Sequence, residues 1–180
     1  MPNEFNTQPL YIATGNPDTY QEASLYAAGQ LGEVVEWRDR SYQLVKCDSG
    51  ATASTSTGVV AANQLAFWKD RSKYLVTNDA KFALYGDVAN SYRNNVAGVF
   101  RAAVTAGNYC LVLKSGRNIA VKEVGSATAG MQLVAEASST AADALGVAIN
   151  TAAPCVPLGV VRTATAATVC YADLDIPRIP

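Results

Sequence analysis

One stretch decides which fold is expected: Val104-Thr-Ala-Gly-Asn-Tyr-Cys-Leu-Val-Leu-Lys-Ser-Gly-Arg-Asn-Ile-Ala-Val-Lys122. In it, two apolar runs, Tyr109–Leu113 and Ile119–Val121, flank the polar sequence Lys114–Arg117. Two such runs around a short turn are typical of a β-hairpin, in which Gly116 supplies the positive φ of the turn. We therefore predict two strands, 109–114 and 118–124, that give the body its rigidity.

Short β-type runs recur along the rest of the chain. One hairpin is predicted from 31–37 and 42–47, and a second from 65–70 and 73–78. After Val96 further strands are expected at 97–104, 131–136, 144–150, 157–163 and 167–172, with Gly, Ser, Thr, Asn or Pro between most of them. No segment carries an apolar stripe of helical period over three turns. The pattern predicts an all-β fold, either a jelly-roll-like β-sandwich, which we prefer, or a small β-barrel.

The chain divides into three parts. Residues 1–30 are polar and interrupted by Pro2, Pro9, Gly15 and Pro17, which is typical of an arm. Residues 31–172 form the β-rich body, in which 49–58 consist only of Ser, Thr, Ala and Gly and are expected to be a loop. Residues 173–180 end in two prolines among the last four positions, so an extended C-terminal tail is predicted.

The composition limits the possible partners. Charged residues make up 16% of the 180 residues, against about 25% in an ordinary soluble domain. This low charge fits a surface covered by neighbouring subunits, and equally a well-packed β protein with a Ser/Thr surface. The net charge of −1 gives no general attraction to nucleic acid. No apolar run is long enough to cross a membrane, and the N-terminus lacks a signal-peptide pattern, so synthesis in a cytoplasm is expected.

Catalytic and metal-binding signals are weak. The chain contains no histidine, which excludes histidine-based triads and metal ligands, and it contains no nucleophile or phosphate-loop motif. Its four cysteines, Cys47, Cys110, Cys155 and Cys170, form no CxxC pair. Cys110 and Cys170 each lie in an apolar run, which favours small buried side chains, and a disulfide is the less favoured alternative in a cytoplasmic product. Asp173 and Asp175 would share one side of an extended tail, where solvation is a better explanation than a calcium site.

Aromatic and basic residues leave two interpretations open. The aromatic residues of the first half, Trp37, Tyr42, Phe67, Trp68, Tyr74, Phe82, Tyr85 and Tyr92, fit either a β-sandwich core or a carbohydrate-binding platform. The basic residues Lys114, Arg117 and Lys122 fit either the protected edge of a sheet or a contact with an acidic partner.

Several segments of the sequence resemble the capsid decoration (cement) proteins of tailed bacteriophages. They are Gln64–Asp79, Arg93–Phe100, Val104–Cys110, Ala127–Val134, Leu158–Val161 and the ending Asp173-Leu-Asp-Ile-Pro177. The resemblance covers residues 30–177, and its motifs are turn and strand phrases without catalytic residues.

The resemblance implies a structural virion protein that is made in the host bacterial cytoplasm. Such proteins bind the outer surface of the phage head, often as homotrimers, and bridge the major capsid proteins. It implies no catalytic residues and no cofactor, and the composition gives no reason to expect a metal, nucleic acid or a membrane as partner. It also implies that the arm or the tail contacts the capsid or neighbouring subunits. The apolar residues placed to do so are Phe5, Leu10, Tyr11, Ile176 and Ile179.

Two other functions remain as alternatives. One is a phage head-fibre or a receptor- or glycan-binding module that uses the early aromatic residues. The other is a small hydrolase with carboxylate or Ser/Lys chemistry, which the lack of histidine and of a nucleophile motif argues against.

Overall fold

A computed structural model describes residues 16–23, 30–50, 59–79, 82, 95–123, 127–135, 147–148, 157–163 and 168–176, of which 147–148 are described by their backbone alone. The regular elements of these residues are strands and short 3₁₀ turns, so the all-β prediction is confirmed. In chain order they are η1 (Pro17–Thr19), β1 (Gln21–Glu22), β2 (Val34–Trp37), β3 (Arg40–Cys47), β4 (Val59–Val60), β5 (Leu65–Asp70), η3 (Arg71–Lys73), β6 (Leu75–Thr77), β7 (Val96–Phe100), β8 (Val104–Thr105), β9 (Tyr109–Lys122), β10 (Gln132–Ala135), β11 (Val147–Ala148), β12 (Gly159–Thr163) and β13 (Val169–Asp175).

The longest strand, β9, corrects the predicted hairpin. Its 14 residues run continuously through the expected turn, and Gly116 is not among the residues with positive φ. The positive φ belongs instead to Asn118, at 52°. The first half of β9 pairs with β3 and the second half with β13. Because other strands satisfy the backbone groups of both halves, β9 does not fold back on itself.

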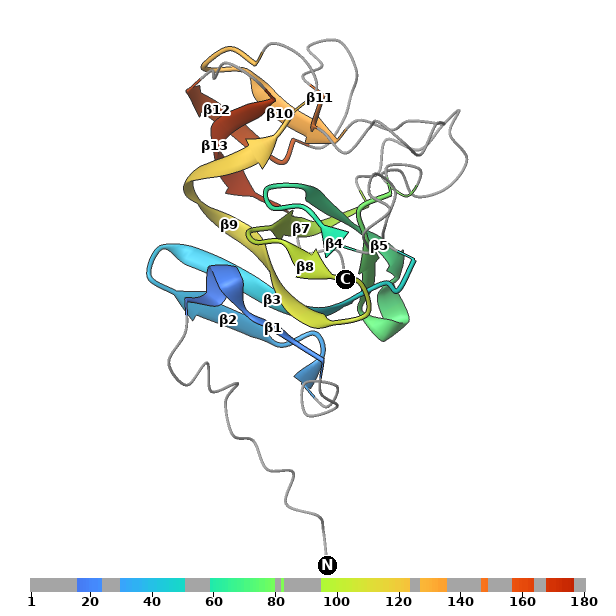
Figure 1. The fold of residues 1–180 in the computed structure, drawn as a ribbon. Helices are drawn as coiled ribbons and strands as arrows, with labels where there is room; N and C mark the ends of the chain where they lie inside the picture. Colours follow the sequence, from blue (N-terminus) through green and yellow to red (C-terminus); the bar gives the residue numbers. More distant parts are fainter. Residues whose placement is uncertain are drawn as a thin grey trace, which may run out of the picture.

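Five strands, one of which is the first half of β9, pair into a closed ring (Figure 1). β3 pairs with β9, β9 with β7, β7 with β5, and β5 with β6, all antiparallel. β6 then returns to β3 in parallel, with Lys46 opposite Leu75 and Cys47 opposite Val76. Closure removes free edges between these strands, so this part of the body is barrel-like.

The second half of β9 leaves the ring and begins another part of the sheet. β13, β12, β10 and β11 follow it in that order, each antiparallel to its neighbour, in the upper part of Figure 1. Two glycines that each precede a valine, Gly98 and Gly159, allow a neighbouring backbone to approach closely. A Cβ on Gly98 would lie 2.7 Å from the Leu113 carbonyl oxygen, and one on Gly159 would collide with the Asp173 carbonyl.

Alternating side chains of the ring enter two hydrophobic clusters, one on each side of β9. Leu111 and Leu113 belong to the first core cluster, which continues into β10, β12 and β13. Cys110 and Val112 belong to the second core cluster, to which all five ring strands and the β4–β8 pair contribute. A strand with both faces buried has no polar face, which explains the unbroken apolar run of Tyr109–Leu113.

Both predicted hairpins are confirmed, and one predicted strand is divided into two. β2 and β3 form the first predicted hairpin, joined by Arg38 and Asp39. β5 and β6 form the second, joined through η3. Residues 97–104 contain two short strands instead of one, because Phe100 and Val104 pair with different partners.

The boundaries of the arm and the tail differ from those predicted. β13 continues to Asp175, so Asp173–Asp175 are paired with β9 and β12 and do not begin a tail. Within the predicted arm, Gln21 and Glu22 pair with Cys110 and Tyr109 of β9. Of the expected loop at 49–58, residues 51–58 lie outside the described part of the chain.

Candidate functional site

The predicted contact residues are described in one case. Ile176 is 3% exposed and packs in the first core cluster, and its backbone N–H donates to the Lys114 carbonyl at 2.9 Å. A contact with another protein through this side chain would require it to leave the core. The other four, Phe5, Leu10, Tyr11 and Ile179, lie outside the described residues.

Most of the early aromatic residues lie in the core. Tyr42 and Phe67 are fully buried and Trp68 is 9% exposed. Trp37, Tyr74 and Phe82 pack partly buried against the two clusters, and Tyr85 and Tyr92 lie outside the described residues. The core interpretation therefore accounts for the described aromatic residues better than a carbohydrate platform does.

The charged residues of β9 and β13 also differ from the expected edge. Lys114 is buried at 5% exposure, while Arg117 on the same strand is exposed. The carboxylate of Asp173 forms an ion pair with Arg162 Nη2 at 2.6 Å and accepts the backbone N–H of Asn118 at 3.0 Å. These contacts, Arg162 first, lower the pKa of Asp173. Among the described residues no three potential metal ligands come together, so the carboxylates of β13 give no metal site there.

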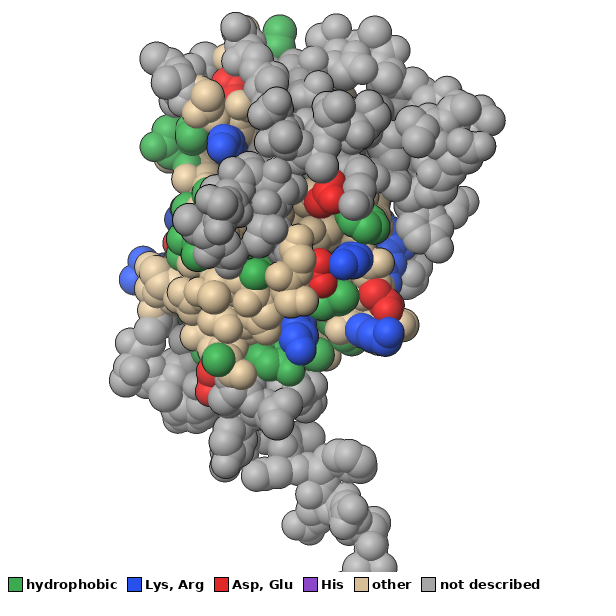
Figure 2. Space-filling model, turned by 45° about the vertical axis from the view of Figure 1, so that its right-hand side comes forward, with side chains coloured by type: hydrophobic (Ala, Val, Ile, Leu, Met, Phe, Trp, Pro, Cys, Tyr) green, Lys and Arg blue, Asp and Glu red, His purple; other side chains and the backbone are tan. Residues whose placement is uncertain are grey.

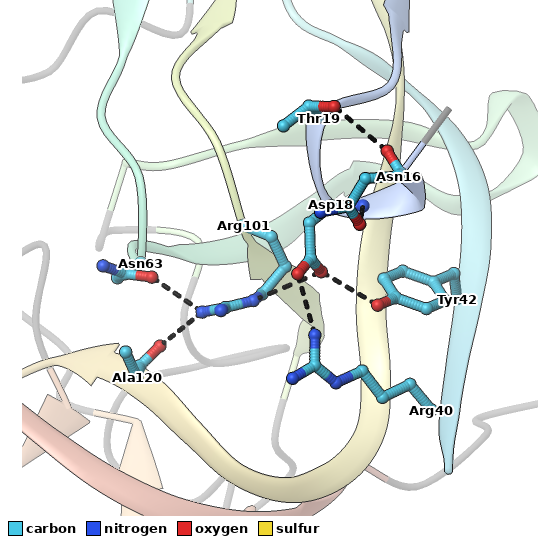
Figure 3. Close-up of polar contacts among 8 residues, drawn as sticks. All are labelled: Asn16, Asp18, Thr19, Arg40, Tyr42, Asn63, Arg101 and Ala120. Atoms are coloured by element: carbon cyan, nitrogen blue, oxygen red, sulfur yellow. Dashed lines mark hydrogen bonds and ion pairs between the residues drawn. The ribbon is translucent and has the colours of Figure 1, made fainter. Parts of the chain in front are cut away.

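One described polar cluster joins the predicted arm to the ring. The carboxylate of Asp18, in η1, accepts hydrogen bonds from Arg40 Nη1 and from the Tyr42 hydroxyl, each at 2.8 Å. It also lies 3.5 Å from Nε of Arg101, which follows β7. Figure 3 shows Asp18 between the two guanidinium groups, with Tyr42 beside it. We call Arg40, Tyr42 and Arg101 the Asp18-binding residues.

The Asp18-binding residues are held in place by the body itself. Arg101 Nη1 donates to Asn63 Oδ1 at 2.7 Å and to the Ala120 carbonyl at 3.0 Å. Tyr42 is anchored in the first core cluster. Arg101 and Tyr42 therefore have contacts that do not depend on Asp18, and with Arg40 they present two permanent positive charges and a hydroxyl donor to one carboxylate.

Local chemistry positions Asp18 on the other side of the contact. Asn16 caps η1, because its Oδ1 accepts the backbone N–H of Asp18 at 3.0 Å. Pro17 follows the cap, where its fixed φ suits the first position of a turn, and its side chain is buried. We call residues 16–22 the N-terminal segment.

Gln21 makes a second set of contacts for the N-terminal segment. Its side chain donates to the Ala103 carbonyl at 3.3 Å and accepts the backbone N–H of Thr105 at 3.1 Å. Its Oε1 also accepts from Asn108 Nδ2 at 3.4 Å. Together with the pairing of β1 to β9, these bonds fix the segment along one edge of β9.

Two groups of this cluster have raised pKa values. Burial, followed by the contact with Asp18, raises the pKa of Tyr42 to about 12. The Tyr42 hydroxyl, followed by the Asp18 carboxylate, raises the pKa of Arg40. Both groups therefore keep their protons near neutral pH, and the ion pair of Arg40 with Asp18 stays charged there.

The sequence contained only part of the signal for this cluster. Asn16-Pro17-Asp18 is a turn pattern that could have been recognised. The partner residues could not, because Arg40 and Tyr42 lie 22 and 24 residues away and give no local pattern.

Two further ion pairs lie elsewhere on the body. Lys69 Nζ lies 2.7 Å from Asp48, and Lys73 Nζ lies 3.2 Å from Asp70. On the face shown in Figure 2, basic and acidic side chains stand side by side and do not gather into a patch of one sign. In the described part of the chain no helix is long and apolar enough to cross a membrane.

No family model matches the chain, and no curated protein matches it.

Proposed function

We propose that the protein is a structural component of a bacteriophage head, a decoration protein that binds the outer surface and bridges major capsid proteins. The observation that carries the proposal is the clamped N-terminal segment on a closed β body, because a fixed anchor suits an arm that bears load between proteins. The proposal also rests on the resemblance of residues 30–177 to decoration proteins. The protein would be made in the host bacterial cytoplasm, would act in the virion without catalysis, and would assemble as a homotrimer.

The body suits a load-bearing part. Its ring is closed by hydrogen-bonded strands, and β9 is shared between the ring and the remaining sheet. Force applied to either part is therefore carried by the same central strand. The alternative, a fibre or glycan-binding module, has less support because its aromatic platform would need Tyr42, Phe67 and Trp68, which are buried.

The test is binding to heads. Purified protein is mixed with heads that lack it, from the phage whose genome encodes the chain, and the heads are sedimented. We expect saturable co-sedimentation and heads that release DNA at a higher temperature. Light scattering over a concentration series measures the mass and tests the trimer.

Two results would remove the proposal. One is the absence of saturable binding to intact heads from that phage. The other is binding that gives no increase in head stability while purified glycans or host cells bind the protein, because these outcomes fit the receptor-binding alternative.

A further inference from the structure

We propose that the side-chain amides of Gln64 and Asn78 form an internal hydration site, in which a long-lived water molecule, or a short chain of waters, joins Gln64 Nε2 to Asn78 Oδ1. Gln64 directly precedes β5 and Asn78 directly follows β6. Because β5 and β6 are antiparallel, these two positions lie at the same end of the ring. The inference does not depend on the proposed function, since it concerns the interior of the body.

Both amides are buried in the body. Gln64 is 0% exposed and Asn78 is 1% exposed. Strand alternation places Gln64 on the same face of β5 as Ala66, and Asn78 on the same side as Val76 of β6. Ala66 and Val76 belong to the second core cluster, so the two amides meet at the end of an apolar core and not at the surface.

The hydrogen bonds that the two amides make determine how each of them is oriented. Oε1 of Gln64 accepts the backbone N–H of Ala61 at 3.2 Å and Nδ2 of Asn78 at 3.0 Å. A backbone N–H needs an acceptor, so Gln64 cannot turn its amide over without losing the bond to Ala61. Asn78 must then present its nitrogen to Gln64, which leaves Gln64 Nε2 and Asn78 Oδ1 for other partners.

The two remaining atoms are one donor and one acceptor. Within the part of the chain that the structure describes, no group forms a hydrogen bond with Gln64 Nε2 or with Asn78 Oδ1. A buried polar group without a hydrogen bond destabilises the folded state, and in folded proteins ordered water commonly pairs with such groups. Because a water molecule both donates and accepts hydrogen bonds, the same ligand satisfies both atoms.

The separation of these two atoms suits water. The nitrogen and oxygen of one carboxamide are about 2.2 Å apart, so the 3.0 Å hydrogen bond between the amides keeps Gln64 Nε2 within about 7.5 Å of Asn78 Oδ1. A hydrogen bond to water spans about 2.9 Å, so one water or a chain of two reaches from the donor to the acceptor. Both amides are uncharged and the neighbouring cluster is apolar, which favours a small neutral ligand over an ion.

The test compares the full-length wild type with a double variant, Gln64→Met with Asn78→Leu. These side chains nearly keep the volume and remove the donor and the acceptor together. Nuclear magnetic relaxation dispersion of the solvent water counts the long-lived internal waters that each protein holds in solution. We expect the wild type to hold at least one more such water than the double variant, because waters elsewhere in the body are common to both proteins. Gln132→Met, at an exposed position of β10, is the control and should leave the count unchanged.

A second measurement observes the site itself. In cross-relaxation spectra of the wild type, the side-chain NH₂ protons of Gln64 should show a cross-peak to water with the sign of a long-lived contact. This measurement needs no substitution, so it decides the question if circular dichroism shows that the double variant is unfolded. Gln64→Met alone leaves the Asn78 amide without its partner, and we expect the folding equilibrium constant to fall about ten-fold or more in urea unfolding.

Three outcomes would overturn the inference. The wild type and the folded double variant could hold equal numbers of long-lived waters, the Gln64 amide of the wild type could show no cross-peak to water, or the count could fall as much in Gln132→Met as in the double variant. Each of these outcomes leaves the binding of the protein to heads unaffected, so the proposed function is tested separately.

Discussion

Asn118 donates its backbone N–H to the Asp173 carboxylate at 3.0 Å, across the place where β9 contains one residue more than β13. Between Ile119 and Gly116 there are two residues on β9, and between their partners Ala172 and Leu174 there is one on β13. This β-bulge holds Asn118 at a φ of 52°. Bulges bend a strand and increase its twist, and here the bulge lies where β9 passes from the ring to the second part of the sheet.

We predict that Asn118→Val destabilises the protein more than Gly116→Ala does. A β-branched residue at positive φ costs about 1–2 kcal/mol, and asparagine tolerates that conformation. At Gly116 an added Cβ would lie 3.0 Å from Cγ of Arg40 and 3.2 Å from Cδ1 of Ile119, so these side-chain atoms need to shift by only a few tenths of an ångström. Urea unfolding of both variants measures the difference, and Asn118→Gly serves as the control that restores the backbone freedom. A larger loss for Gly116→Ala would favour the hairpin that the sequence suggested.

We predict that the Tyr42→Phe variant loses less folding stability at alkaline pH than the wild type does. The pKa of Tyr42 is raised to about 12 in the folded protein, above its ordinary value of 10.0. A raised pKa means that the stabilisation is complete below about pH 10 and is lost as the pH rises toward 12. We expect a contribution of about 1 kcal/mol, because water still reaches part of the cluster.

The measurement is the free energy of unfolding at about pH 9 and about pH 11, on either side of the ordinary pKa of tyrosine. Tyr171→Phe, which alters an exposed tyrosine, is the matched control. Equal slopes for the Tyr42→Phe variant and the wild type would contradict the assigned role of the hydroxyl. Tyr20 and the buried thiols titrate in the same range, so the slope of the variant is reduced and not abolished.

We predict that three thiols are unreactive in the folded protein. Cys47, Cys110 and Cys170 are free and buried, and desolvation raises the pKa of each thiol, to about 12 for Cys47 and about 11 for Cys170. The reactive species is the thiolate, which is scarce at such pKa values. In a Cys155→Ser variant, a thiol reagent near pH 8 should react with fewer than one group per folded chain and with all three after denaturation. Rapid labelling of the folded variant would show that one of these sites opens.

We predict that Leu111→Asp and Val112→Asp each prevent folding. The two side chains are 2% and 0% exposed and enter opposite core clusters. Burial of such a side chain contributes about 1.5–3 kcal/mol, and an unpaired buried carboxylate adds a larger penalty. Circular dichroism and thermal unfolding measure the effect, with exposed Arg117→Ser on the same strand as the control. A cooperative transition in either Asp variant would show that its face of β9 is not core.

Local features of the fold were predictable from sequence. The hairpins β2–β3 and β5–β6 follow from apolar runs separated by short polar turns, and in each the strands that pair are close in sequence. The run 109–122 was predicted incorrectly, because a Ser-Gly pair between apolar runs has the composition of a turn. The φ of Gly116 depends on which strands flank β9, and these partners lie far away in the chain.

The candidate site, too, was predictable from the sequence only in part. The low charge and the lack of histidine predicted a binding or assembly protein in preference to an enzyme. The contact of Arg101 with Asp18 was not predicted, because nothing in the sequence indicates that the end of β7 and η1 lie together. Ile176 was predicted as a contact residue from its apolar side chain, whereas the structure uses that side chain in the core.

The sequence by itself determined that the chain is a β protein with short turns, since side-chain alternation and turn residues act over a few positions. Tertiary structure alone decided that β9 is one strand shared by two parts of the sheet, and that Asp18 meets Arg40 and Arg101. The physical reason is that strand pairing and charge pairing join residues distant in sequence. Their energies depend on a geometry that exists only when the whole body has folded.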